Sequence, residues 1–560
     1  MASLDSHQRV IGTKVEWAPK RLLCMMQSTF HWPCAALVCA MAVVSAASAG
    51  EPSRTLHIGL VQQPNSLDPL HATQFYENYV TEATFSALTL IDDRGDTVPD
   101  LAERVPTRAN GLISADGRTI TYRLHAGVRW QDGVPLTSAD VRYTLDRMRD
   151  PTSNFVEASF YSIIDRLDTP DARTVVLHLK SPWADATSQL FVGGQNGSIL
   201  PKHILEHVAN LGTSSFESAP VGSGPYALVR WERGNKLVLR ANPTYFRGKP
   251  AIDRIELDFV PDQTVIGIRL KTHEIDFSPQ LTQLGAEAFE HAPEFARAKA
   301  PTFTDLELVF QTARAPFDDA RMRRALAIAI DRARLVDTVY HHFAEVGDDL
   351  VPSRSPFHKR DGTVREHGDL DAARRLLDAA GWRAGSDGIR RKNGNALSFP
   401  LTVPAGYADI VACAVAMQAT WKSLGVDVEL RPIVANQLYE TVTGTLSSGK
   451  FVAALQRDGY ATSPDRADSL TTSGLPPHGR NYARYANRDV DRWTAQARGT
   501  YDDARRSALY AKISARVRED AAVTPLLWVS QPYVWDARLT GLRPETVNSD
   551  FWNVREWRWR

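Results

Sequence analysis

The length of the chain sets the first limit on its architecture. The sequence has 560 residues, and one hydrophobic core rarely serves more than about 250 to 300 residues before a chain divides. We therefore expect at least two domains. Hydrophobic residues make up 43% and charged residues 23% of the chain, which excludes disordered, collagen-like and polytopic membrane proteins.

Charge narrows the range of partners. Basic and acidic residues both number 65, so the chain has no net positive field that would attract phosphate backbones. We expect no nucleic acid partner.

The N-terminal segment predicts export. The basic residues Lys14, Lys20 and Arg21 precede an apolar run at 34–47, which is too short to cross a bilayer. The small residues Ala47-Ser48-Ala49 follow this run. This pattern predicts a cleavable signal peptide at 1–49 and a periplasmic mature chain that begins at Gly50. A downstream start codon and a short uncleaved anchor are the alternatives.

The cysteines exclude an internal disulfide in the exported chain. Cys24, Cys34 and Cys39 lie in the signal segment, so only Cys413 remains after cleavage. The stability of the mature protein must come from its cores.

Local patterns predict a mixture of strands and helices. Alternation predicts a strand at 56–60, a second strand that begins at Thr119, and a hairpin across 227–240. The segment Thr137-Ser138-Ala139-Asp140 is typical of a helix start.

The second half changes to helical spacing. We expect helical structure across 318–340 and a helix at 370–380 that ends at Gly381. A strand near 401–403, a helix at 410–424 and a strand at 426–433 then follow in order. This βαβ order predicts an α/β lobe.

A series of segments resembles the family 5 extracellular solute-binding proteins, the peptide and nickel substrate-binding family of ABC transporters, which includes dipeptide- and oligopeptide-binding proteins. The segments occur in the family's order and cover almost the whole mature chain. They are SLDP (66–69), VPDLAERV (98–105), YRLHAGVRWQDGVPLTSADV (122–141), VGSGPYALVRW (221–231), ANPTYFRGKPAIDRIEL (241–257), APFDDARMRRALAIAIDR (315–332) and LDAARRLLDAAGW (370–382).

The resemblance implies an α/β, periplasmic-binding-protein-like fold of the cluster C type. Two lobes would be joined by a hinge, with an extra subdomain in lobe I. On that template lobe I is 50–306 with the subdomain inserted at about 96–214, lobe II is 307–526, and 527–560 returns to lobe I. The tail carries three tryptophans that we expect to pack onto lobe I rather than stack on a ligand: Trp552, Trp557 and Trp559.

The resemblance also implies a function. The chain would be the periplasmic substrate-binding component of an ABC importer, closing its lobes around a small solute, most simply a peptide or peptide-like compound. Its partners would be that ligand and the permease subunits in the inner membrane. We expect a monomer that is not an enzyme and has no cofactor and no metal.

One segment departs from the family pattern. Peptide-binding members usually hold the ligand's amino group with an aspartate, but the corresponding position here is Tyr460 or Thr462, depending on the register. Asp458 could replace that aspartate. Otherwise Asp458 would be a solvated loop acid, and the ligand would be a modified peptide, an opine-like compound, a sugar or a chelate.

Other candidate ligand contacts follow from position in the family. The loop after the first strand would contribute Asn65, Ser66, Gln74, Phe75 and Tyr76. The alternative roles of these residues are turn capping and core packing. Gln311, at the inferred crossover between the lobes, would contact the ligand or satisfy hinge backbone groups.

The sequence also contains features of two other functions. The segment His203-Ile204-Leu205-Glu206-His207 has the H-x-x-E-H spacing of zinc peptidases, although no downstream glutamate helix supplies a third ligand. A ligand sensor that docks on a membrane signalling partner would need the same hinge closure, so the sequence does not separate it from a transport receptor.

Overall fold

The computed structural model describes residues 55–560 except 73–74, 154, 156–157, 195–196, 280, 360–361, 363, 441, 460–462 and 545–549. The predicted signal peptide and the candidate residues Gln74, Tyr460 and Thr462 lie outside this range, as does the side chain of Phe75. The chain divides into Met1–Pro52 and Ser53–Arg560, and the described residues all belong to the second unit. No helix among the described residues combines the length and apolar character needed to cross a membrane.

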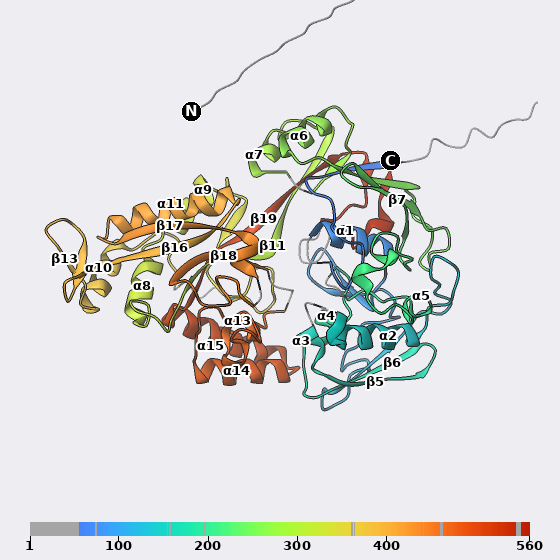
Figure 1. Ribbon diagram of the computed structural model, residues 1–560, viewed down its shortest axis with the longest axis horizontal. Coiled ribbons are helices and arrows are strands. Elements are labelled where there is room, and N and C mark those ends of the chain that lie inside the picture. Colours follow the sequence, from blue (N-terminus) through green and yellow to red (C-terminus); the bar gives the residue numbers. More distant parts are fainter. Residues whose placement is uncertain are drawn as a thin grey trace, which may run out of the picture. The chain divides into compact units, whose positions relative to one another are not determined.

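Two long antiparallel strands form the centre of the structure. β11 (Phe295–Phe310) pairs with β19 (Val523–Asp536) in the middle of an 11-stranded sheet. β18, β16 and β17 continue the sheet beyond β11, whereas β10, β1, β9, β8 and β7 continue it beyond β19. Figure 1 shows β11 and β19 running between these two groups. The pairing of β11 with β19 shifts register between Pro301 and Asp305.

The β19 side of the sheet is built on parallel strands. β1 pairs in parallel with both β9 and β10, and helix α1 packs its buried face onto the same apolar core. Trp557 from the C-terminal tail is fully buried in that core and meets Phe277 edge to face at 5.7 Å. The elements are β1 (Thr55–Leu60), α1 (Phe75–Thr84), β7 (Tyr226–Glu232), β8 (Lys236–Ala241), β9 (Arg254–Phe259), α6 (Gln263–Lys271), β10 (Phe277–Ser278), α7 (Gln283–Glu287), β20 (Leu539–Thr540) and β21 (Arg558–Trp559).

A subdomain with its own three-stranded antiparallel sheet and its own apolar core lies between β1 and β7 in the sequence. The predicted helix start is confirmed, because Thr137 caps α2 and Asp140 completes a capping box with it. The elements are β2 (Thr89–Ile91), β3 (Thr97–Pro99), β4 (Thr119–Arg123), α2 (Ser138–Arg149), α3 (Ala158–Tyr161), β5 (Ile164–Asp171), β6 (Thr174–Leu179), α4 (Ala186–Gln189) and α5 (Lys202–Leu205).

The β11 side of the sheet contains the predicted βαβ unit, which is confirmed. β16 (Ser398–Ala405), α11 (Ala408–Lys422) and β17 (Asp427–Val434) follow one another, and the two strands pair in parallel. β18 (Ala453–Gly459) is also parallel to β16. The helical stretch expected at 318–340 is divided, because Asp331 begins a second helix by accepting a hydrogen bond from the Arg334 amide.

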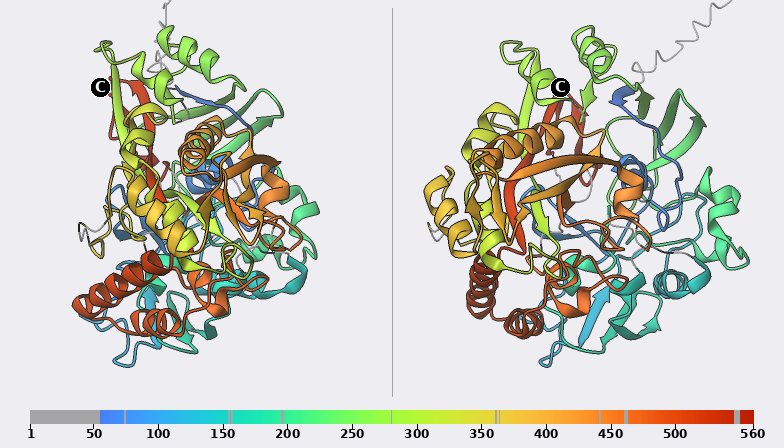
Figure 2. Two further views of the ribbon diagram at one scale, coloured as in Figure 1. Left: turned by 90° about the vertical axis from the view of Figure 1, so that its left-hand side faces the viewer. Right: turned by 60° about the vertical axis from the view of Figure 1, so that its left-hand side comes forward.

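The remaining elements cover this side. α14 and α15, in dark red, lie at the same end of the molecule as β4, in light blue, in both views of Figure 2. The elements are α8 (Ala320–Ile328), α9 (Arg332–Thr338), β12 (Ala344–Val346), α10 (Leu370–Ala379), β13 (Arg383–Ala384), β14 (Arg390–Lys392), β15 (Asn395–Ala396), α12 (Ala435–Tyr439), α13 (Ala467–Leu470), α14 (Arg488–Gly499) and α15 (Asp503–Asp520).

Candidate functional site

The carboxyl ends of three parallel strands meet at one edge of the sheet. β16 ends at Ala405, β17 at Val434 and β18 at Gly459. Gly459 pairs with Thr304 of β11, next to the register shift of that strand. In open α/β sheets ligands bind outside the carboxyl ends of the strands, so this edge is the candidate site.

A buried polar face leads to that edge. Asp305 and Glu307 of β11 are register partners of Asp458 and Gln456 of β18, and all four side chains are buried. Residues two apart on a strand share a face, so these side chains form one cluster. The Gln456 Nε2 donates to Glu307 Oε1 at 2.6 Å.

Two arginines neutralise part of this cluster. Arg466 Nη2 lies 2.8 Å from Glu307 Oε2, and Arg466 Nη1 lies 3.7 Å from Asp305 Oδ2. Arg480 donates to Asp458 and, through Nε, to Asp468 at 2.7 Å. Asp458 is therefore a buried, ion-paired residue, and the alternative of a solvated loop acid is wrong.

Burial dominates the electrostatics of the cluster. It raises the pKa of Glu307 to about 7, although the charge of Arg466 opposes the shift. Burial also raises the pKa values of Asp305 and Asp458, against the nearby guanidinium groups. Neither oxygen of Asp305 accepts a hydrogen bond from the described residues. The cluster therefore holds protons more tightly than exposed acids would.

The loop after β1 is organised by turn contacts. The Asn65 amide donates to Glu77 Oε1 at 3.1 Å, and the Asp68 amide donates to Ser66 Oγ at 3.1 Å. Ser66 is buried, whereas the side chain of Asn65 is exposed, and Tyr76 is half-buried in α1. Ser66 thus has a capping role in the structure, and Asn65 presents its side chain to solvent.

Gln311 lies at the opposite end of the β11–β18 pair. Its amide donates to the carbonyl of Val452 at 2.9 Å, and its side chain is buried. It follows Asp305 by six residues of strand, which corresponds to roughly 20 Å. The structure does not bring Gln311 together with Asp458.

A direct contact joins the subdomain to the segment that follows β18. The carboxylate of Asp185, at the start of α4, accepts from Ser463 Oγ at 2.8 Å and from Arg506 of α15. The Ala184 amide donates to the Arg498 carbonyl at 2.8 Å. Sequence reasoning missed Asp185 and Arg506, which are 321 residues apart, and no local pattern signals their pairing.

The H-x-x-E-H segment does not form a zinc site. α5 ends at Leu205, so the helix does not carry His207 onto the same face as His203. His203 Nε2 lies 2.7 Å from Asp132 Oδ2, and the His207 side chain is 93% exposed. Their ring nitrogens therefore have separate environments.

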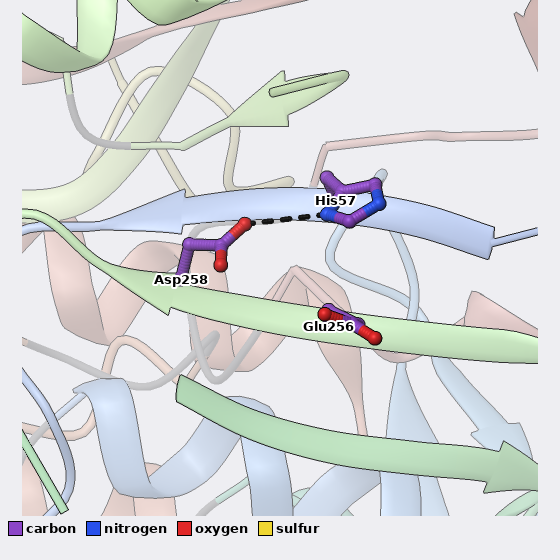
Figure 3. A group of neighbouring side chains, drawn as sticks. All are labelled: His57, Glu256 and Asp258. Carbon is purple, nitrogen blue, oxygen red and sulfur yellow. Dashed lines mark hydrogen bonds and ion pairs between the residues drawn. The ribbon is translucent and has the colours of Figure 1, made fainter. Parts of the chain in front are cut away.

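Among the described residues, one group of side chains has the composition of a metal site: His57, Glu256 and Asp258 (Figure 3). His57 Nδ1 lies 3.4 Å from Asp258 Oδ2, and this contact raises the pKa of the imidazole. Glu256 already accepts from Lys236 at 2.6 Å and from Arg254 at 2.7 Å. An imidazole that holds its proton more tightly than usual and two neighbouring cations disfavour a metal ion.

Comparison with known proteins agrees with this geometry. The sequence model of the bacterial extracellular solute-binding proteins, family 5, matches residues 96–479. Protein XP55 of Streptomyces lividans is 30% identical over 502 residues, which cover 89% of this chain and 88% of that protein. The oligopeptide-binding protein AppA of Bacillus subtilis is 26% identical over 523 residues, covering 91% and 93%.

Solved structures share the fold. NikA from Brucella suis in complex with Fe(III)-EDTA superposes with a TM-score of 0.78 at 22% identity, covering 91% of this chain and 100% of that chain. AppA from Bacillus subtilis, in complex with a nonapeptide, gives 0.76 at 24% identity with the same coverage.

The class of protein follows from these findings. The chain has the two-lobed α/β fold of the periplasmic binding proteins. It belongs to family 5 of the bacterial extracellular solute-binding proteins, and its role is that of the substrate-binding component of an ABC importer.

Proposed function

We propose that the chain binds a peptide or peptide-like solute in the periplasm and delivers it to the permease subunits of an inner-membrane ABC importer. The proposal is supported by the relatives named for peptide binding. It includes export through the signal peptide at 1–49 and a monomeric, non-catalytic protein that needs no cofactor.

The contact of Asp185 with Ser463 and Arg506 is the observation that carries this function. It connects the subdomain with the segment directly after β18, beside the candidate site. A solute that touches both sides of this contact favours the closed form of the protein, because the solute makes all of its contacts only when the two lobes are closed. Closure then reports occupancy to the permease.

The proposed lobe limits follow the strands. Lobe I comprises 50–306 with a subdomain at about 96–214, lobe II comprises 307–526, and 527–560 returns to lobe I. β11 and β19 would be the hinge strands, since β11 pairs with β18 of one group, β19 pairs with β10 of the other, and their mutual pairing shifts register between Pro301 and Asp305.

The proposed ligand contacts come from two loops and the hinge. The loop after β1 would contribute Asn65, Ser66, Gln74, Phe75 and Tyr76. The segment at the end of β18 would contribute Asp458, Tyr460 and Thr462. Because Arg480 already pairs with Asp458, an ammonium group of the ligand would have to share that carboxylate. Gln311, at the far end of the hinge strand, would contact another part of the ligand or satisfy hinge backbone groups.

Titration calorimetry of the mature protein with short peptides, sugars and metal chelates tests the function. We expect peptides to bind and the radius of gyration in solution scattering to decrease when they do. Asp185→Asn should weaken binding by about tenfold, because a neutral amide holds Arg506 less strongly than a carboxylate. Exclusive binding of one sugar or chelate, or hydrolysis of a peptide, would overturn the proposal.

A further inference from the structure

Large apolar side chains are exposed at the candidate edge. Tyr407 is 39% exposed, Val434 65% and Val442 67%. Val434 is the last residue of β17 and the register partner of Ala405, and Tyr407 follows two residues after Ala405. Val442 follows α12, the short helix that begins directly after Val434. We call Tyr407, Val434, Tyr439 and Val442 the lobe II rim.

These side chains do not stabilise the helices that begin at the edge. Tyr407 and Val434 occupy the N-cap positions of α11 and α12, and neither makes a side-chain capping bond. Ser, Thr, Asp and Asn are the residues that normally stabilise this position. The sequence thus places exposed apolar groups where polar ones would help folding, and clustered exposed apolar groups are typical of binding surfaces.

Hydrogen bonds to the Glu440 carboxylate hold the part of the rim that contains Val442. The carboxylate of Glu440 accepts from the amides of Val442 at 3.0 Å, Gly444 at 2.8 Å and Thr443, which fastens the turn that carries Val442. The backbone beside Val442 is therefore held by contacts within the chain.

Arg457 connects the rim to β18. Its side chain pairs with Asp409 and its guanidinium carbon lies 5.9 Å from the centre of the Tyr407 ring. The Arg457 amide donates to the Tyr439 hydroxyl at 3.4 Å. Arg457 is thus paired with Asp409, and the Glu440 carboxylate accepts from backbone amides, so the rim itself presents mainly apolar and aromatic surface to a ligand.

We propose that the lobe II rim receives an apolar, preferably aromatic, side chain of the bound solute and so determines which solutes bind. This inference rests on the proposed function. It follows from position, because the rim lies at the carboxyl ends of the same parallel strands as the candidate site. It also follows from chemistry, because covering exposed apolar surface is favourable and an aromatic ring can stack on Tyr407.

A scanned peptide series tests the inference. Pentapeptides of alanine and glycine would carry Phe, Leu, Ser or Lys at each position in turn, with calorimetry as the readout. We expect at least one position where the wild type prefers Phe to Ser by about tenfold. Tyr407→Ala and Val434→Ser should reduce that preference to about twofold or less while the Ser peptide keeps its affinity.

Val415→Ser is the matched control, since Val415 is 50% exposed on the same helix, two turns from Tyr407. It should leave the preference unchanged. Three outcomes would overturn this inference but leave the proposed function standing. They are a wild type that binds peptides without preferring Phe or Leu, rim variants that keep the full preference, and a control variant that loses it. A wild type that binds none of the peptides would instead overturn the proposed function.

Discussion

The two faces of the β11–β18 pair are equally buried, but one carries apolar side chains and the other carries charged and polar ones. On one face Leu306, Leu308 and Leu455 are fully inaccessible to solvent and belong to the largest apolar core of lobe II. On the other face Asp305 and Glu307 are buried to the same degree, together with their partners on β18. The same two strands therefore support an apolar core and an ionic cluster.

The difference shows that the two faces serve different purposes. Apolar burial contributes free energy directly, whereas buried ion pairs rarely stabilise more than well-packed apolar groups would. The guanidinium groups of Arg466 and Arg480 come from the segment after β18, the one in which Ser463 contacts Asp185. We infer that the ionic face positions this segment beside the candidate site, while the apolar face stabilises the lobe.

Arg466→Met should have the largest effect on stability. It leaves Glu307 and Asp305 without their nearest cation, and breaking a buried ion pair costs about 4 kcal/mol. Urea unfolding measures the change. The control is Arg516→Met, because Arg516 forms an exposed pair with Glu519 at 3.1 Å and should contribute less than about 0.5 kcal/mol. Equal losses in both variants would contradict the assigned role of Arg466.

Leu308→Ala on the apolar face should cost about 3 kcal/mol, from lost burial and a residual cavity. The distinguishing measurement is solute affinity at a temperature where both variants are folded. Leu308→Ala should retain wild-type affinity, whereas Arg466→Met should weaken it by displacing the segment after β18. If Leu308→Ala lowers affinity as much as Arg466→Met does, the division of roles between the faces is wrong.

Much of the fold could be predicted from the sequence, because local patterns encode it. The βαβ unit from β16 to β17 has strand and helix periods with Gly425 as the helix stop, and Gly425 has a φ of +80°. The capping pair Thr137 and Asp140 lies within four residues. The buried tail residue Trp557 agrees with the expected packing of the C-terminus.

The ionic cluster could not be predicted in the same way. Alternation around Asp305 and Glu307 is typical of a strand with one solvent-exposed face. The cation that compensates their burial, Arg466, lies 159 residues beyond Glu307. The same limit applies to Asp458, whose partner Arg480 belongs to a later loop. A contact between two distant segments produces no periodic pattern in the sequence of either segment.

The pH dependence of stability gives the smallest expected effect on the ionic face. Burial raises the pKa of Glu307 from 4.5 to about 7, so the folded protein retains a proton that the unfolded chain releases across this range. The stability contributed by protonated Glu307 is therefore complete below about pH 4.5 and is lost as the pH rises through about 7.

Glu307→Gln removes this dependence because glutamine does not ionise. The free energy of unfolding of the variant, relative to wild type, should increase by about 3 kcal/mol between about pH 4.5 and about pH 8. Urea unfolding at several pH values measures it, with Glu519→Gln as the exposed control. The burial of Glu307 predicts that the curves of Glu307→Gln and wild type diverge, whereas the curve of Glu519→Gln, which changes an exposed side chain, should follow that of wild type. If the curves of Glu307→Gln and wild type run parallel, water or a shift of Arg466 stabilises the Glu307 carboxylate as well as bulk solvent does. The electrostatic difference between the two faces of the β11–β18 pair would then be wrong.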